Sequence, residues 1–289
     1  MVRCGRPATA STKVPSRRLI IRPGGIGDCI LSLPAIEFLR SEYTEVWVPS
    51  AIVPLIRFAD ARAIASTGID LLGLPGVDPP ADLIAKLRSF DSIVSWYGAN
   101  RAEFREQMAA LGLPFRFLDA LPEPSAKIHA ADFFLKQAGG EGVAVPRIDC
   151  ERETAADFAV IHPFSGSARK NWPMERFREV AARLSIPVRW CAGPEEAIEH
   201  AVRFENLYEL ACWLASARVY IGNDSGITHL AAAVGVPVVA IFGPSDPAVW
   251  APRGERASVM SSELKEITVD EVLESIRQVS PDVCGNVAS

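Results

Sequence analysis

Short runs of apolar and β-branched residues alternate with helical patterns along almost the whole chain, and this alternation starts twice. It first starts with a strand-like run at 19–22, followed by a helical pattern at about 28–41. It starts again with a strand-like run at 158–162, followed by a helical pattern at 174–184 that Pro173 introduces. Strands that alternate with helices are typical of parallel sheets covered by helices. The sequence therefore predicts an α/β fold built from two similar units.

A glycine-rich stretch lies between the two starts. Residues 139–142 read Gly-Gly-Glu-Gly, and Val145-Pro146 follows. Such segments commonly link domains, so we expect the domain boundary within 139–157. Two α/β units of similar size indicate a ligand held in a cleft between them. The expected division is a disordered basic tail (1–18), a first domain (19–150) and a second domain (151–289).

The composition excludes several classes of protein. With 289 residues, of which 49% are hydrophobic and 22% charged, the chain can form a sizeable core. A net charge of -5 argues against a general nucleic-acid-binding protein. The longest strongly apolar run, 230–242, contains Gly235 and Pro237 and is too short to span a bilayer. We therefore expect no nucleic-acid partner and no membrane-spanning segment.

The N-terminal tail and the cysteine pattern indicate the cellular compartment of the protein. Residues 1–18 are basic, but no apolar stretch follows them that could form the core of a secretion signal. The six cysteines include no CxxC pair, so neither a zinc knuckle nor a redox dithiol is expected. These features predict a cytoplasmic protein with reduced cysteines.

The first segment with recognisable chemistry is a glycine loop at 24–28, Gly-Gly-Ile-Gly-Asp, at a turn from strand to helix. Glycines allow the backbone to approach a ligand closely, and a helix N-terminus offers free N–H groups. A dinucleotide-binding loop has a third glycine where this chain has Ile30. The next strand, 46–48, ends in Pro49-Ser50 and not in the acid that would bind a ribose. The segment therefore argues against NAD as a cofactor.

Asp28 stands at the start of the helix that follows this loop. One interpretation is a capping carboxylate, which the helix dipole favours. The other is a general base that faces the cleft, because a helix N-terminus keeps a carboxylate ionised and ready to accept a proton. The loop alone leaves both interpretations open.

The second segment, 162–173, reads HPFSGSARKNWP and follows a strand. Ser165, Ser167 and Lys170 suit phosphate oxygens, because hydroxyl groups donate hydrogen bonds and lysine supplies a mobile point charge. The alternative is a solvated surface loop. The apolar Trp172-Pro173 pair favours an anchored loop over a merely flexible one.

The third segment, 220–233, reads YIGNDSGITHLAAA and has the most specific pattern. A strand end meets a helix whose first turn supplies the Ser225 hydroxyl and free N–H groups around Gly226, which is an anion-binding arrangement. His229 lies on the same helix face. Its structural alternative is a histidine bonded to a neighbouring loop. Asp224 is expected to cap the helix or to hold a sugar hydroxyl.

These segments together resemble the ADP-heptose:lipopolysaccharide heptosyltransferase family, glycosyltransferase family 9. The resemblance lies in five stretches that occur in the family's order between residues 21 and 252: RPGGIGDCILSLPAI, IHPFSGSARKNWPMERF, AGPEE, NLYELACWLA and YIGNDSGITHLAAAVGVPVVAIFGPSDPAVWAP. The third segment alone is fairly specific, and all five together make coincidence improbable.

The resemblance implies a GT-B fold, in which two Rossmann-like domains with parallel sheets face each other across a cleft. It implies an inverting, metal-independent transfer of a heptose or related sugar from a nucleotide-diphosphate sugar, with ADP-heptose expected, to a hydroxyl of a glycan or lipopolysaccharide-core acceptor. No resident cofactor and no divalent metal are expected. Membrane contact is expected to be peripheral at most, at the inner face of the inner membrane.

The resemblance also assigns roles to individual residues. Asp28 matches the proposed base, and the acceptor-side loop contributes Gly24, Gly25 and Gly27. Lys170 and His229 complete the expected catalytic set with Asp28. The expected donor-binding residues are Ser165, Gly166, Ser167, Lys170, Glu195 near the acid that holds the ribose, Asp224, Ser225, Gly226 and His229.

Three features of the chain depart from the family pattern. Gly166 stands where a threonine is common, and Ser225 replaces a threonine. The loops between 44 and 126 look shortened compared with the family. Because these loops belong to the acceptor side, the resemblance does not identify the acceptor. Three alternatives therefore remain: a GT-B nucleotide-sugar epimerase or hydrolase, a catalytically degenerate nucleotide-sugar-binding protein, and an oxidoreductase.

Overall fold

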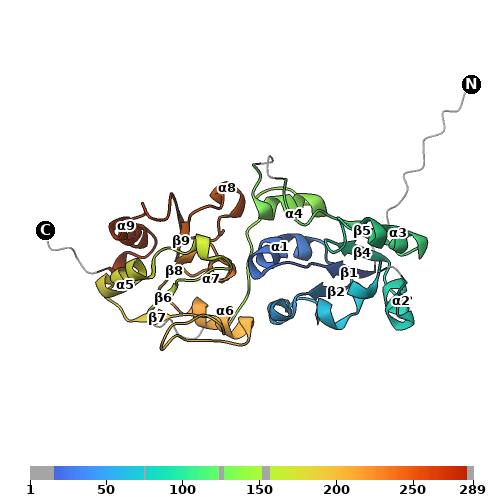
Figure 1. Ribbon diagram of the computed structural model, residues 1–289, viewed down its shortest axis with the longest axis horizontal. Coiled ribbons are helices and arrows are strands. Elements are labelled where there is room, and N and C mark those ends of the chain that lie inside the picture. Colours follow the sequence, from blue (N-terminus) through green and yellow to red (C-terminus); the bar gives the residue numbers. More distant parts are fainter. Residues whose placement is uncertain (1–15, 75, 124–126, 152–156, 285–289) are drawn as a thin grey trace, which may run out of the picture.

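The chain folds into two parallel sheets of five strands each, which lie side by side along the long axis of the molecule (Figure 1). The computed structural model describes residues 16–74, 76–123, 127–151 and 157–284. In the first sheet the strand order is β3-β2-β1-β4-β5, and in the second it is β10-β9-β8-β6-β7. Every strand pair in both sheets is parallel. The α/β fold with two similar units is therefore confirmed.

The strands of the first sheet are β1 (Arg17–Ile21), β2 (Tyr43–Val48), β3 (Asp60–Ala63), β4 (Ser92–Ser95) and β5 (Phe115–Phe117). Those of the second are β6 (Ala159–His162), β7 (Val188–Trp190), β8 (Val219–Asn223), β9 (Val238–Phe242) and β10 (Ala257–Ser261). The helices are α1 (Ile26–Phe38), α2 (Ala81–Arg88), α3 (Ala102–Ala110), α4 (Ala130–Ala138), α5 (Met174–Arg183), α6 (Leu207–Ala215), α7 (Gly226–Ala233), α8 (Pro247–Trp250) and α9 (Val269–Val279).

Each sheet is apolar on both faces, because its strands are covered by helices on both sides. In β1, Leu19 and Ile21 pack toward α2 and α3, whereas Ile20 between them packs toward α1 and α4. In the second sheet, α5 and α9 cover the outer face. The inner helices of the two sheets, α1 and α4 with α6 and α7, form one continuous core that joins the two halves.

The connectivity determines where a ligand can bind. In the first sheet the strand order reverses between β1 and β4, and in the second between β6 and β8. Ligands of open parallel sheets bind at the carboxyl ends of the strands, at such reversal points. The three segments identified in the sequence follow β1, β6 and β8, so all three lie at these two points.

The prediction of a disordered tail over 1–18 is wrong at its end. Strand β1 begins at Arg17, because the Ser16 carbonyl accepts a hydrogen bond from Tyr43 and the Arg17 N–H donates to the Asp91 carboxylate. Residues 1–15 lie outside the described part. The boundary between 150 and 151 stays a prediction, and residues 152–156 beside it also lie outside that part. Within the described residues, none of the helices combines the length and the apolar character needed to cross a membrane.

Candidate functional site

A cavity of about 940 Å³ lies where the carboxyl ends of the two sheets face each other. Both halves of the chain line it. The first half contributes the glycine loop and the start of α1, including Gly25, Gly27 and Asp28. The second half contributes the ends of β6, β7, β8 and β9 and the start of α7. The predicted cleft between the two units therefore exists.

The starts of α1 and α7 meet at two glycines beside this cavity, in the centre of the molecule (Figure 1). A Cβ atom on Gly226 would lie 2.7 Å from the Ile26 Cβ and 3.0 Å from the Gly27 nitrogen. A Cβ atom on Gly27 would lie 3.0 Å from the His229 ring. Neither glycine has a positive φ angle, so the backbone conformation does not require glycine at these positions. What requires glycine is the close approach of the two helices, which leaves no room for a Cβ atom.

The position of Asp28 is compatible with both interpretations that the sequence left open. Its Oδ2 accepts a hydrogen bond from the Gly25 N–H at 3.0 Å, which caps α1. Its side chain also lines the cavity, and Oδ1 has no hydrogen-bond partner among the described residues. A capping carboxylate thus leaves one oxygen available to a ligand. Gly24, with a φ of 127°, shapes the turn but does not line the cavity.

Arg22 lies beneath Asp28, and sequence reasoning missed it. Its side chain is 1% exposed, and its guanidinium donates to the Asp28 carbonyl oxygen at 3.2 Å and to Ser32 Oγ at 3.1 Å. It also lies 4.5 Å from the centre of the Phe134 ring. The signal was an arginine directly after the apolar strand β1. A buried cation so close to a carboxylate contributes a positive potential at the start of α1.

Lys170 and Asp224 form an ion pair that also lines the cavity. The Lys170 Nζ lies 2.6 Å from Asp224 Oδ2, with 35% of the lysine side chain and 7% of the aspartate side chain exposed. Two segments that lie far apart in the sequence therefore place a cation at one point, as anion binding requires.

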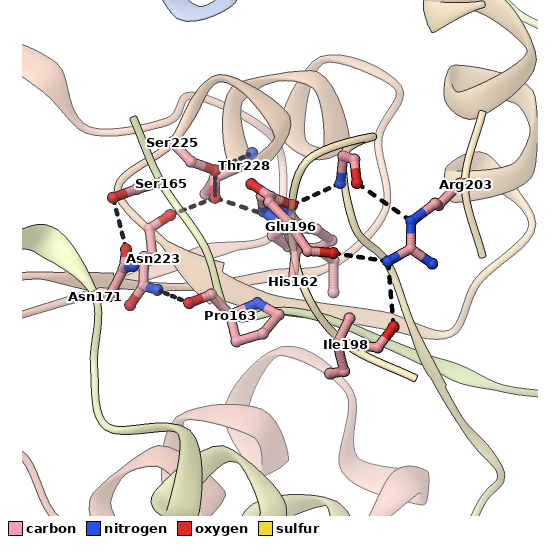
Figure 2. Close-up of polar contacts among 12 residues, drawn as sticks. His162, Pro163, Ser165, Asn171, Glu196, Ile198, Arg203, Asn223, Ser225 and Thr228 are labelled. Carbon is pink, nitrogen blue, oxygen red and sulfur yellow. Dashed lines mark hydrogen bonds and ion pairs between the residues drawn. The ribbon is translucent and has the colours of Figure 1, made fainter. Parts of the chain in front are cut away.

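The hydroxyl groups of Ser225 and Thr228 stabilise the start of α7 (Figure 2). Ser225 Oγ accepts from the Thr228 N–H at 3.3 Å, and Thr228 Oγ1 donates to the Asn223 carbonyl at 2.5 Å. The N–H groups of Gly226 and Ile227 have no partner among the described residues and stay available to an anion.

Asn223 ties the loop after β6 to the end of β8 (Figure 2). It is fully buried, accepts from the Trp172 N–H at 2.9 Å and donates to the Pro163 carbonyl at 2.8 Å. This confirms that the loop is anchored. The residue was not identified from the sequence, where it is one polar residue beside Asp224.

The serine-rich part of this loop is only partly directed at the cavity. Ser165 and Gly166 line it, whereas Ser167 does not. Ser165 Oγ lies 2.7 Å from Asn171 Oδ1 and 2.8 Å from the Ser167 carbonyl (Figure 2). A Cβ atom on Gly166 would meet nothing within 4 Å, so the structure does not require a glycine there.

Glu195 needs a correction, because the structure places its neighbour Glu196 in the cavity. Glu196 Oε2 accepts from the Gly193 N–H at 2.6 Å and from His162 Nε2 at 3.1 Å, which turns the side chain inward (Figure 2). Glu195 is exposed and does not line the cavity. The apolar spacing of the sequence also predicts a helix near 195–201, and this prediction is wrong. His200 has a φ of 56°, and the segment forms turns.

His229 is buried beside both helix starts. Burial lowers its pKa to about 4, with the nearby Asp224 carboxylate acting in the opposite direction. The ring is therefore neutral at pH 7, so it can offer a hydrogen bond but not a positive charge. Its Nδ1 is buried and has no partner within the described part of the chain.

The described residues contain no group of three or more His, Cys, Asp or Glu side chains that could hold a metal ion. The positive groups that face the cavity are Lys170 and the start of α7. The cavity therefore combines groups that can bind an anion with a carboxylate.

Comparisons with known sequences give one family. Residues 136–275 match the family described as Glycosyltransferase family 9 (heptosyltransferase). Lipopolysaccharide heptosyltransferase 1 of Escherichia coli O18:K1:H7 is 28% identical over 144 residues, which cover 43% of this chain and 44% of that protein. Lipopolysaccharide core heptosyltransferase OpsX of Haemophilus influenzae is 22% identical over 86% of this chain and 85% of that protein. The chain thus matches less than half the length of the first relative.

Solved structures show the same fold. A family 9 glycosyltransferase from Veillonella parvula has a TM-score of 0.72 at 18% identity, over 92% of this chain and 97% of that one. E. coli heptosyltransferase WaaC with ADP has a TM-score of 0.63 at 19% identity, over 90% of this chain and 99% of that one. The iron-containing dodecameric glycosyltransferase TibC of enterotoxigenic E. coli has a TM-score of 0.61 at 18% identity, over 92% of this chain and 76% of that one. The GT-B fold is confirmed.

Proposed function

From the match of residues 136–275 to glycosyltransferase family 9, we propose that this chain transfers a heptose from ADP-heptose to a hydroxyl group of a glycan acceptor of the lipopolysaccharide-core type. The observation that carries the proposal is the arrangement of the cavity. The Asp28 carboxylate, the Lys170 ammonium and the open start of α7 all line the same cavity. A transfer reaction needs both a carboxylate and groups that bind an anion, because one partner must lose a proton while the other leaves as an anion.

The donor is placed by its diphosphate. The free N–H groups of Gly226 and Ile227 and the Lys170 ammonium supply donors and positive charge for phosphate oxygens. Ser165 lines the same cavity, but its hydroxyl already donates within its own loop. Glu196 replaces Glu195 as the acid for the ribose. ADP is the proposed nucleotide because the WaaC neighbour is described with ADP and with ADP-2-deoxy-2-fluoro heptose.

The reaction is a single in-line displacement. The acceptor hydroxyl gives its proton to the free Oδ1 of Asp28 while its oxygen forms a bond to the anomeric carbon. The bond between that carbon and the diphosphate oxygen breaks at the opposite face, and ADP leaves with both electrons of that bond. Attack from the face opposite the leaving group inverts the anomeric centre. His229, as a neutral ring, contributes hydrogen bonding only.

The negative charge that develops on ADP is stabilised by preorganised protein groups. Lys170 and the α7 N-terminus are already held in place, which is the condition for effective electrostatic stabilisation. We therefore propose a metal-independent reaction. The TibC neighbour is described as iron-containing, so the rate after dialysis against EDTA tests this point directly. A rate restored only by added metal would contradict it.

The first experiment is a calorimetric and thermal-shift panel with ADP, UDP, GDP, CMP and NAD, without added metal. A ligand present at one hundred times its dissociation constant stabilises the folded protein by about 2.7 kcal/mol. We expect a selective shift with ADP. A selective shift with UDP or GDP would replace the donor, and a shift with NAD alone would favour an oxidoreductase.

The second experiment separates transfer from its alternatives. ADP-heptose is incubated with and without a heptose-deficient lipopolysaccharide-core acceptor, and the products are resolved by mass spectrometry. We expect ADP release that depends on the acceptor. Release of free sugar or an epimer without acceptor would favour a hydrolase or epimerase, and binding without turnover would favour a degenerate binding protein. The proposed setting is the cytoplasm, with the acceptor at the inner face of the inner membrane.

A further inference from the structure

Glu196 enters the cavity with only one carboxylate oxygen free. Oε2 accepts two hydrogen bonds, from Gly193 at 2.6 Å and from His162 at 3.1 Å, whereas Oε1 has no partner among the described residues. Burial raises the pKa of Glu196, but the hydrogen bonds from His162 and Gly193 outweigh it, so the pKa lies below its usual value. The free oxygen is therefore an ionised acceptor, and hydroxyl groups are the ligand groups that it fits.

His162 provides one of the two donors at the end of β6. The residue is 3% exposed, and its Nε2 donates to Glu196 Oε2 at 3.1 Å, which leaves Nδ1 as the second ring nitrogen. That Nδ1 is buried and has no partner within the described residues. A buried polar atom without a partner costs stability, so this histidine is not explained by the stability of the fold alone.

Arg203 holds the loop that carries Glu196 (Figure 2). Its exposed guanidinium donates to the carbonyl oxygens of Glu196 at 2.7 Å, Ile198 at 3.2 Å and Gly193 at 3.3 Å. The same loop contains His200, whose φ of 56° is the one positive value outside glycine among the described residues. Left-handed backbone at such a residue is strained and persists only where its surroundings hold it.

The position of Glu196 in the cavity indicates which part of a bound nucleotide lies next to it. It follows the edge strand β7, and the lining of the same cavity includes the apolar residues Phe204, Leu207 and Leu210. A carboxylate repels a diphosphate, which instead fits the groups around Lys170 at the start of α7. The neutral, hydroxyl-bearing part of a nucleotide with its flat base therefore fits the Glu196 side.

We propose that His162 and Arg203 are positioning residues that hold the free Glu196 oxygen toward the ribose hydroxyls of the donor nucleotide. They thereby give the site its preference for a ribonucleotide. The proposal rests on the nucleotide-donor part of the proposed function and is independent of the acceptor.

The test compares ADP with 2′,3′-dideoxy-ADP, which lacks both hydroxyls, by isothermal titration calorimetry. A hydrogen bond to a charged group predicts that the wild-type protein prefers ADP by about tenfold or more. His162→Phe keeps a buried ring but removes the donor, and we expect the preference to fall below about threefold. His162→Gln restores an N–H donor at a similar reach, and we expect most of the preference to return.

Arg203→Ala is the second variant, and because the side chain is exposed its removal leaves no cavity in the core. We expect it to lower the preference for ADP severalfold while binding of 2′,3′-dideoxy-ADP stays nearly constant. Arg178→Ala removes an equally exposed arginine from α5 and is the matched control, with no expected change.

The outcomes separate the two proposals. An unchanged preference in both His162→Phe and Arg203→Ala overturns the positioning role and leaves the nucleotide donor standing. A wild-type protein that binds both nucleotides equally well also overturns it. If no nucleotide in the earlier panel binds the wild-type protein, the proposed function itself fails. Should His162→Phe not fold, Arg203→Ala with its control decides the question.

Discussion

The starts of α1 and α7 occupy equivalent places in the two halves but have opposite electrostatic character. Each helix follows a central strand, β1 or β8, at the point where the strand order of its sheet reverses. The α1 start is closed by the Asp28 carboxylate, which uses the Gly25 N–H. The α7 start is capped by the neutral Ser225 hydroxyl and keeps two N–H groups open beside Lys170.

This difference shows how one architecture can provide two kinds of site. A helix N-terminus attracts negative charge in either case. When the protein supplies that charge itself, as with Asp28, the site offers a base. When it supplies only a hydroxyl, the site stays open to an anionic ligand. The predictions below test this division, in order of decreasing expected effect.

Removal of the carboxylate at α1 is expected to have the largest effect. Asp28→Ala should lower the rate of transfer by about a hundredfold or more, the usual scale for loss of a general base, with ADP binding nearly intact. Steady-state kinetics and calorimetry measure the two quantities. Asp28→Asn is the matched control for capping, since its amide oxygen can still accept from Gly25. A near-normal rate in either variant would remove Asp28 from the mechanism.

Removal of the cation at α7 should act on the other function. Lys170→Ala deletes a charged partner of the diphosphate and leaves Asp224 unpaired, so ADP binding is expected to weaken on the order of tenfold to a hundredfold. Titration with ADP measures this. Arg169→Ala alters the same loop at an exposed residue that does not line the cavity, and should leave binding unchanged. Equal losses in both variants would indicate a general charge effect.

The contact between the two helix starts can be broken without altering a charged group. Gly226→Ala places a Cβ atom 2.7 Å from the Ile26 Cβ, so the helices must separate. We expect the free energy of unfolding to fall by about 1–3 kcal/mol, as in overpacked cores. Chemical denaturation measures it. Gly166→Ala is the control, because a Cβ there meets nothing within 4 Å. Unchanged stability in Gly226→Ala would show that the contact is loose.

The neutral His229 between the two starts predicts a dependence of stability on pH. Its pKa is about 4 in the folded protein and about 6.5 when unfolded, so between these values the unfolded chain binds more protons. Stability should therefore fall as the pH is lowered from about 6.5 to about 4, with a contribution to the slope of at most about 1.4 kcal/mol per pH unit. Above pH 6.5 this contribution is constant.

Denaturation of the wild-type protein and of His229→Asn at several pH values measures that contribution as the difference between the two slopes. His129, whose pKa is also lowered by burial, is retained in both proteins and contributes equally. Identical slopes would mean that His229 does not exchange protons on unfolding in this range.

Much of the fold could be predicted from the sequence, because the strands and helices follow from local patterns of apolar and polar residues. The three polar segments follow central strands, and parallel connectivity brings strand ends to one edge of a sheet. That is why Asp28, Lys170 and Asp224, which are far apart in the sequence, could be placed at one site. Errors arose where local patterns compete, as at 195–201, where a helical pattern forms turns around His200.

The remaining features depend on contacts that no local pattern records. The sequence shows two adjacent acids, but only the hydrogen bonds from His162 and Gly193 select Glu196 over Glu195. Arg22 becomes buried because Phe134 and Ser32 enclose it.

The sequence by itself determined the order of the elements, the three polar segments and the resemblance to glycosyltransferase family 9, because all of these reside in residue types and short spacings. Only the tertiary structure decided which glycines let the helix starts approach each other, which acid enters the cavity and whether His229 carries a charge. The physical reason is that packing, hydrogen-bond selection and desolvation depend on neighbours brought together by folding, from both halves of the chain.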